Sequence, residues 1–392
     1  MIVRTKFQIP RLRKTLVERP SLMSKLDGGM ATKLTLVSAQ AGYGKTTALG
    51  GWANRCSAHV AWVSLDRLDN DWNSFWRCVI ASVRMSVPDF GQSAEKLLEQ
   101  EAEVSHETVI ATFLNELNAI AGKLVIILDD YHAIDLPDIH RSLGYFLEYV
   151  PPHVHLYIAS RADLPVPTAR LLSKGEINLI RAQDLRFELE EGVAFFKDMT
   201  DLPITKEQVL ELFRQTEGWV SGLQLAAISL KDSGNVAESI RQFDGRQRHI
   251  SDYLLEEVYR HQSASMRDFL LATSVLRRMN RDLCQAVTGH EDSQARLERL
   301  EQLNLFIVPL DDQRSWYRYH HLLSDFLQRI GAEEEPEKQL RYHIRAAVWL
   351  ESHGFEEDAV DHYIAGQQAA DAVRIIERIL PGYLQAKRAV MM

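Results

Sequence analysis

Leu34-Thr-Leu-Val-Ser-Ala-Gln-Ala-Gly-Tyr-Gly-Lys-Thr-Thr47 constrains the fold more strongly than any other part of this sequence. It begins as an apolar, β-rich run, passes through a glycine-containing turn and continues into a helical segment after Lys45. Gly42 and Gly44 let backbone N–H groups turn inward, and the start of the helix presents further N–H donors, so the turn suits phosphate groups. We therefore predict a P-loop, with alanine in place of its first glycine, whose nucleotide-binding residues are Ala39, Gln40, Ala41, Gly42, Tyr43, Gly44, Lys45, Thr46 and Thr47.

Two side chains of this loop and two later carboxylates have distinct expected roles. In a P-loop the lysine, here Lys45, contacts the β- and γ-phosphates, and the hydroxyl of Thr46 binds Mg²⁺. The run Leu124-Val-Ile-Ile-Leu128 has the form of a Walker B strand that ends in Asp129 and Asp130. We expect Asp129 to hold the Mg²⁺ shell and Asp130 to orient an attacking water. The expected ligand is ATP or ADP with Mg²⁺.

Another strand, Val154–Ala159, ends in Ser160 and Arg161 at what should be the same edge of the sheet. Arg161 is therefore a candidate for sensing the γ-phosphate, and we count it with Lys45 and Asp130 as a catalytic residue. The alternative is an arginine that is simply solvated at a strand end.

Short β-rich runs alternate with longer helical runs from residue 34 to about residue 187. Such alternation predicts an α/β P-loop domain, in which helices cover both faces of a parallel sheet. The expected strands are 34–38, 60–65, 124–128, 154–159 and 178–181.

After Phe187 the strand signal fades and helical periodicity replaces it. Further on, β-like runs at 305–310 and 316–319, preceded by helices and followed by a helix over 321–330, indicate a winged-helix module. The charged, proline-containing segment 331–336 is typical of a linker, and paired helices beyond it suggest a tetratricopeptide-like array. We predict a nucleotide-binding domain over 1–188, a helical domain over 189–246, a winged helix over 247–331 and the start of helical repeats over 337–392.

The composition excludes several classes of protein. No run approaches the roughly 18 to 20 apolar residues of a membrane span, and the N-terminus lacks the pattern of a secretion signal. The three cysteines form no CxxC pair, which fits a reducing compartment, so we expect a cytoplasmic protein without membrane contact. A net charge of -9 argues against DNA binding by this chain.

The winged-helix segment contains two adjacent histidines, in Tyr317-Arg-Tyr-His320-His321. Either His320 or His321 is a candidate contact to the β-phosphate, if this module folds back on the nucleotide. Packing of these histidines against their aromatic neighbours is the alternative. For the tryptophans at 52, 62, 72, 76 and 219 we expect core packing rather than base stacking.

Collinear motifs give the chain a resemblance to a known family. They are Val37–Thr47, Ala61-Trp-Val-Ser-Leu-Asp66 with Asp69-Asn-Asp71, Asp129-Asp-Tyr-His132, Ser160-Arg-Ala-Asp-Leu-Pro165, Asp184-Leu-Arg-Phe187, Thr216-Glu-Gly-Trp-Val-Ser-Gly-Leu-Gln-Leu225 and Tyr317-Arg-Tyr-His-His-Leu322. In this respect the chain resembles the MalT-like regulators, large LuxR-type bacterial transcription activators within the STAND class of signalling ATPases.

The resemblance implies a nucleotide-dependent switch. In such proteins an ADP-bound closed monomer opens on binding inducer and ATP, and then self-associates to activate transcription. It also implies that a small-molecule or protein inducer acts through sensor repeats, and that DNA is bound by a C-terminal helix-turn-helix, both of which we expect to lie mostly or wholly outside this chain. The Gly-x-Pro motif of STAND proteins reads Gly222-Leu-Gln224 here, so its proline contact is not carried over.

Three functions remain open at this point. The leading prediction is a regulatory ATPase with slow hydrolysis. One alternative is a P-loop phosphotransferase that acts on a small substrate, although the chain devotes its remaining length to helical modules rather than to an acceptor pocket. The other is an interaction module that the nucleotide stabilises without being hydrolysed.

Overall fold

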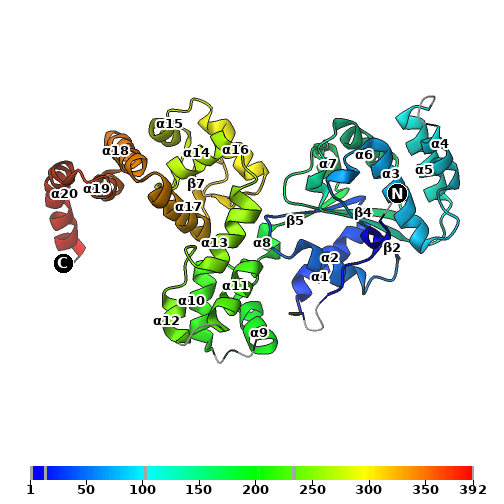
Figure 1. Cartoon of the computed structure of the whole chain (residues 1–392), viewed down its shortest axis with the longest axis horizontal. Coiled ribbons are helices and arrows are strands. Elements are labelled where there is room, and N and C mark those ends of the chain that lie inside the picture. The colour runs from blue at the N-terminus through cyan, green and yellow to red at the C-terminus, as the bar shows by residue number, and fades with distance from the viewer. Residues whose placement is uncertain are drawn as a thin grey trace. The chain divides into compact units, whose positions relative to one another are not determined.

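The computed structural model describes residues 3–12, 16–100, 104–200, 202, 204–231 and 235–390, without the side chains of 199 and 381–390. The chain forms two compact units (Figure 1). The first unit comprises Met1–Phe213 and Gly218–Ala227, and the second comprises Arg214–Glu217 and Ile228–Met392. The bounds of the four domains expected from the sequence are not tested by this division into two units and remain a prediction.

The first unit is built on a parallel five-stranded sheet. Its strands lie in the order β2-β3-β4-β1-β5. They are β1 (Leu34–Ser38), β2 (His59–Ser64), β3 (Leu124–Asp129), β4 (Val154–Ser160) and β5 (Ile177–Arg181). All residues of β1, β3 and β4 are buried, as expected for strands that are covered on both faces. The α/β fold predicted from the alternating runs is confirmed.

Helices cover both faces of this sheet (Figure 1). On one face Tyr157 of β4 stacks on Trp52, with the ring centroids 4.4 Å apart, while neighbours of Tyr157 in β4 face a hydrophobic cluster on the other side. The helices of this unit are α1 (Pro20–Gly28), α2 (Lys45–Ala53), α3 (Trp72–Ser86), α4 (Gln92–Glu99), α5 (His106–Asn118), α6 (Pro137–Tyr149), α7 (Ala169–Ser173), α8 (Ala182–Leu185) and α9 (Leu189–Met199).

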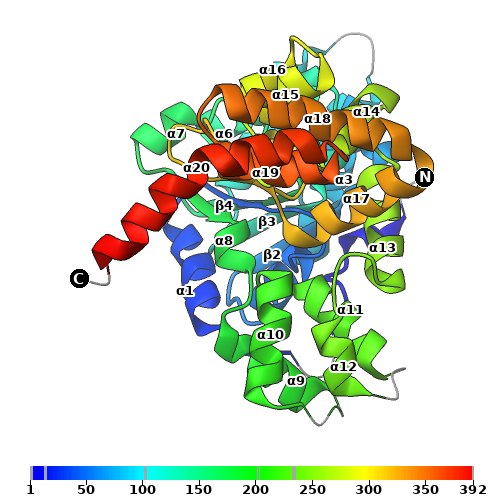
Figure 2. The same ribbon diagram turned by 90° about the vertical axis from the view of Figure 1, so that its left-hand side faces the viewer.

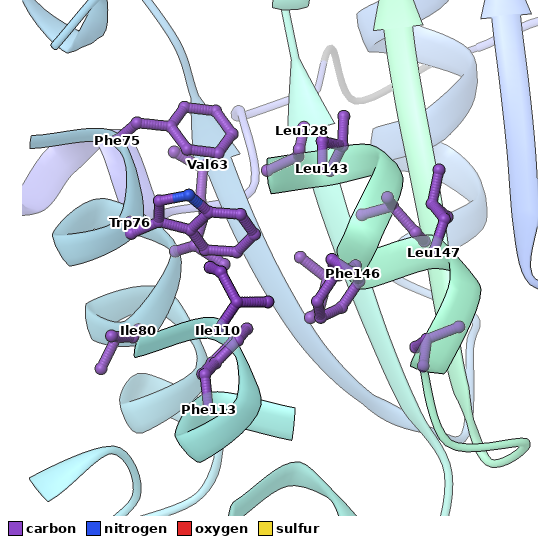
Figure 3. Packing of buried hydrophobic residues seen from close by; sticks show 14 of the residues in the cluster. Val63, Phe75, Trp76, Ile80, Ile110, Phe113, Leu128, Leu143, Phe146 and Leu147 are labelled. Carbon is purple, nitrogen blue, oxygen red and sulfur yellow. The ribbon is translucent and has the colours of Figure 1, made fainter. Parts of the chain in front are cut away.

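Aromatic side chains form the centre of the core between α3, α5, α6 and the sheet (Figure 3). The rings of Trp76, Phe113 and Phe146 lie with their centroids 5.7 to 5.8 Å apart. The Trp76 indole N–H donates to the hydroxyl of Ser142 at 3.0 Å, so its polar atom is satisfied inside the core. This packing fixes the strands whose C-terminal ends carry the candidate site.

Two helices run across the division between the units, α10 (Lys206–Thr216) and α11 (Val220–Lys231). The second unit then continues through α12 (Val236–Arg241), α13 (Arg248–Leu254), a π-helical turn over Leu255–Tyr259, α14 (Ala264–Thr273), α15 (Arg281–Thr288) and α16 (Ser293–Gln302). An antiparallel hairpin follows, formed by β6 (Ile307–Pro309) and β7 (Tyr317–Tyr319), and then α17 (His321–Glu334). Helices, hairpin and closing helix match the winged-helix arrangement predicted from the sequence.

The linker expected at 331–336 is shorter than predicted, because only Glu335 lies outside a helix. Helix α17 continues to Glu334, and Pro336 occupies the first turn of α18 (Pro336–Ser352), where its missing N–H is no loss. Gly331 lies against Gln339, so the two helices pack closely at this point. The charged, proline-containing segment therefore coincides with the junction between α17 and α18.

The last helices pack on one another as the paired helical pattern predicted (Figure 2). They are α18, α19 (Glu356–Ala365) and α20 (Ala369–Val390). Ala346, Ala347 and Ala359 are fully buried, and their small side chains allow α18 and α19 to approach closely. In the part of the chain described here, no helix has the length and apolarity needed to cross a bilayer.

Candidate functional site

The loop between β1 and α2 has the backbone shape that a phosphate site requires. Gly42 and Gly44 adopt φ angles of +77° and +76°, and α2 begins at Lys45. These left-handed glycines turn the chain so that the N-terminus of α2 opens toward the loop, which is the arrangement that presents N–H groups to an anion. The structure thus has the strand, turn and helix expected of a P-loop.

Lys45 lies inside this loop and is 7% exposed. Its Nζ donates to the carbonyl oxygens of Ala39 at 2.7 Å and Gln40 at 2.9 Å. Burial, together with the positive charge of Arg161, lowers the pKa of Lys45 to about 8, although Asp130 and Asp129 act in the opposite direction. A phosphate group at this position would favour the charged ammonium.

Thr46 and Asp129 meet although 83 residues separate them, with the hydroxyl donating to Asp129 Oδ1 at 3.1 Å. Asp129 is 2% exposed, and burial together with the charge of Asp130 raises its pKa to about 6. Mg²⁺ in nucleotide sites takes one or two protein oxygens and completes its shell with phosphates and waters. The hydroxyl and carboxylate side by side fit that ion.

The strand order explains why the other predicted residues gather here. Strand β4 lies between β1 and β3, so Arg161, which follows β4, lies between the phosphate loop and the carboxylates that end β3. Asp130 has a left-handed φ of +57°, and its N–H donates to Asp129 Oδ1 at 3.1 Å. Its own carboxylate is 46% exposed, which leaves it accessible to water.

A cavity of about 700 Å³ adjoins the loop. Pockets for drug-sized ligands commonly measure about 300 to 1,000 Å³, so this one is large enough for a nucleoside. From the loop and α2 it is lined by Tyr43, Gly44, Thr47, Ala48, Gly51 and Arg55; its other walls are Arg11, Leu12, Leu16–Pro20, Met23, Phe187, Phe195, Val220 and Gln224. The sequence does not predict these lining residues, because they come together only in the folded chain.

Arg19 holds one wall of this cavity in place. Its guanidinium donates to the carbonyls of Leu185 at 2.9 Å and Arg186 at 2.8 Å, and to the Glu191 carboxylate at 3.1 Å. It also lies over the ring of Phe187, 5.1 Å from its centroid. The segment before α1 is therefore fixed to the segment between α8 and α9.

The outer side of the phosphate loop is covered by the start of α11, which the sequence did not indicate. The Trp219 indole N–H donates to the carbonyl of Ala41 at 3.1 Å, and the backbone N–H of Ser221 donates to that of Gly42 at 3.0 Å. Trp219 is fully buried, as core packing predicts, but it also contacts the candidate site.

The two winged-helix histidines have different surroundings within the second unit. His320 is 2% exposed. Its Nε2 lies 3.0 Å from the Thr216 carbonyl, and its Nδ1 accepts from the N–H of Leu322, so it caps α17. Burial lowers its pKa to about 4, which keeps the ring neutral. The side chain of His321 is 60% exposed and its Nε2 lies 3.7 Å from Glu217.

The sequence of this chain is similar to those of known regulatory proteins. Residues 255–339 match the family model described as the MalT winged helix domain. The chain is 34% identical over 374 residues to the HTH-type transcriptional regulator MalT of Cronobacter sakazakii, an alignment that covers 94% of this chain and 41% of that protein. It is also 29% identical over 367 residues to the serine/threonine-protein kinase PknK of Mycobacterium tuberculosis, covering 93% of this chain and 33% of the kinase. The chain therefore spans less than half the length of these relatives.

Among solved structures, a Walker-type ATPase of Pyrococcus abyssi resembles the chain with a TM-score of 0.54 and 16% sequence identity. The alignment covers 81% of this chain and 97% of that one. This likeness concerns the fold.

Proposed function

We propose, for a chain that belongs to the MalT-like regulators, that it binds ATP or ADP with Mg²⁺ at the loop Ala39–Thr47 and uses the nucleotide as a regulatory switch. The observation that carries the proposal is the gathering of Lys45, Thr46 and Asp129 at one sheet edge beside a cavity of about 700 Å³. The loop N–H groups and Lys45 bind the phosphates, and the cavity takes the nucleoside.

Hydrolysis would use the same edge of the sheet. Thr46 and Asp129 would hold Mg²⁺, and the ion would neutralise charge at the phosphates. Asp130 orients a water for attack on the γ-phosphorus; the bond from that phosphorus to the bridging oxygen breaks, and ADP and inorganic phosphate leave. Arg161, whose positive charge acts on Lys45, would balance charge on the γ-phosphate. We infer that turnover is slow and resets the switch.

Regulation, rather than phosphate transfer to a small acceptor, is favoured by the rest of the chain. Its length beyond the sheet forms a winged helix and stacked helices, and the similarity to MalT extends over 94% of its residues. A nucleotide that contacts more than one module favours the arrangement in which it reaches them all, by its differential affinity for the two states. His321 is the proposed contact from the winged helix, because its side chain is 60% exposed whereas both ring nitrogens of His320 are already hydrogen-bonded.

For the whole protein we propose the partners that the family resemblance implies. The ATP-bound form self-associates, an inducer acts through further helical repeats, and a helix-turn-helix outside this chain contacts DNA. The place of action is the cytoplasm.

Replacing Asp130 by Asn separates regulatory hydrolysis from a nucleotide that is purely structural. The exchange removes the carboxylate that orients water but keeps its shape, so ADP affinity should persist while phosphate release falls at least about tenfold. Phosphate release from ATP by both forms is the measurement. Equal, negligible release by both would indicate a structural nucleotide, and rapid transfer to a small acceptor would support a phosphotransferase.

A further inference from the structure

Four consecutive carbonyl groups of the phosphate loop, those of residues 39–42, are all hydrogen-bonded. Lys45 takes the first two from inside the loop. The carbonyl of Ala41 accepts from the indole of Trp219, 178 positions later in the sequence. The carbonyl of Gly42 accepts from the backbone N–H of Ser221. The start of α11 thus completes the hydrogen bonding of the loop backbone.

These contacts determine where the loop N–H groups point. In a trans peptide the C=O and the following N–H point in opposite directions. A carbonyl of Ala41 held toward Trp219 therefore aims the N–H of Gly42 away from it, and the contact to Ser221 does the same for the N–H of Tyr43. N–H groups aimed away from the covering side are those that an anion within the loop would meet.

The fit between the loop and α11 is tight. A Cβ atom added to Gly42 would lie 2.6 Å from the Ser221 hydroxyl and 2.7 Å from Trp219 Nε1. Trp219 is fully buried, so its indole N–H is shielded from water. The N–H of Phe187 donates to the carbonyl of Gly218 at 2.8 Å, which holds the residue before Trp219 from another side.

The other end of the same turn is held within the second unit. The Arg318 guanidinium makes two hydrogen bonds of 2.8 Å to the Glu217 carboxylate, one to each oxygen. Burial alone would raise the pKa of Glu217, but the bond to Arg318 and the nearby positive charges hold it at about 2. Thr216, one residue earlier, is bound through its carbonyl by His320. Only Gly218 separates Glu217 from Trp219.

We propose that Trp219 is a positioning residue of the nucleotide site, and that the Glu217–Arg318 pair sets the turn that carries it. The winged-helix strand β7, which contains Arg318, then influences nucleotide affinity through the backbone of residues 216–221 rather than only by touching the ligand. This inference rests on the proposed nucleotide binding at the loop.

Trp219→Phe tests the first half, because it removes the indole N–H and keeps an aromatic ring. Trp76→Phe is the matched control: Trp76 is also buried and also donates one indole hydrogen bond, to Ser142, but it lies in the core and not at the loop. The melting temperature should fall by a similar amount in both variants, because each loses one buried indole hydrogen bond. We expect ADP affinity, measured by calorimetric titration, to fall about tenfold in Trp219→Phe and to stay unchanged in Trp76→Phe.

Glu217→Gln tests the second half, because it removes the ion pair without touching the loop. Glu217→Gln should weaken ADP binding about threefold. The double variant Glu217→Arg with Arg318→Glu should bind ADP more tightly than Glu217→Gln, because it pairs the two charges in reverse. Equal ADP affinity in the unaltered chain, Trp219→Phe and Glu217→Gln would overturn the inference while leaving nucleotide binding intact. An unaltered chain that binds neither ADP nor ATP would instead remove the proposed function, and the inference with it.

Discussion

Asp129 shows how one buried carboxylate links pH to the proposed metal ion. Its folded-state pKa is raised to about 6, first by burial and then by the charge of Asp130. A raised pKa means that the folded chain holds this proton more tightly than the unfolded chain does. Protonated Asp129 therefore stabilises the folded chain fully below about pH 4. This stabilisation is lost as pH rises through about 6.

The same ionisation creates the ligand that Mg²⁺ requires, so we predict that the effect of Mg²⁺ on ADP affinity grows as pH rises through about 6. Titrations with and without Mg²⁺ between about pH 5 and 7.5 measure it. Asp129→Asn supplies the baseline, because the phosphate of ADP itself titrates with a pKa of about 6. A Mg²⁺ effect of the same size at both pH limits in the unaltered chain would exclude Asp129 as the metal ligand.

At the scale of elements, the site was predictable where its signal is local. The run Leu34–Ser38, the glycine turn and Lys45 lie side by side in the sequence, and the buried strand before Asp129 is a continuous apolar run. Strand β4, with Arg161 after it, also followed from such a run.

The cavity and the role of Trp219 could not be predicted in that way. Leu12, Phe187 and Gln224 line one cavity, although each lies in a segment whose own pattern indicates only packing. Trp219 was expected to be buried, and it is, but its hydrogen bond to Ala41 depends on how α11 packs against the loop. Contacts of this kind are set by tertiary structure, not by periodicity.

The close contact between the phosphate loop and the start of α11 leads to a prediction for glycine substitution. Gly42 and Gly122 both have positive φ, so alanine costs backbone strain of roughly 1 to 2 kcal/mol at either position. Only at Gly42 would the new Cβ also collide with α11, since nothing lies within 4 Å of one at Gly122. We expect Gly42→Ala to lower ADP affinity at least about tenfold and Gly122→Ala to leave it unchanged.

Calorimetric titration of both glycine variants, each checked for folding by circular dichroism, provides the measurement. Equal ADP affinities would show that the close approach of α11 does not matter for the ligand.

Over the whole chain, the sequence predicted the order of the helices and strands better than their ends. The sheet, the hairpin after the helices and the paired helices at the end all appear in their expected places. The junction at 331–336 was misread because glutamate and proline are common in linkers, yet both are well tolerated near helix ends. Two helices, α10 and α11, also cross the division between the compact units.

A switch of the proposed kind predicts a nucleotide-dependent assembly state. The chain should sediment as a monomer with ADP and as a larger species with a non-hydrolysable ATP analogue, because the proposed switch self-associates only when ATP is bound. Sedimentation velocity at several protein concentrations measures this. A single species of the same mass under both conditions would argue that these residues do not drive assembly by themselves.

Lys45 and its loop are proposed to bind a nucleoside di- or triphosphate, and calorimetric titration of ADP into the unaltered chain and Lys45→Ala measures this binding. Lys96→Ala, on the exposed face of α4, serves as the control. We predict binding by the unaltered chain and the control, and a loss of at least about 100-fold in Lys45→Ala, because a buried charge that faces the phosphates is removed while the sheet is untouched. Undiminished ADP affinity in folded Lys45→Ala, or no binding of ADP or ATP by the unaltered chain, would contradict the claim.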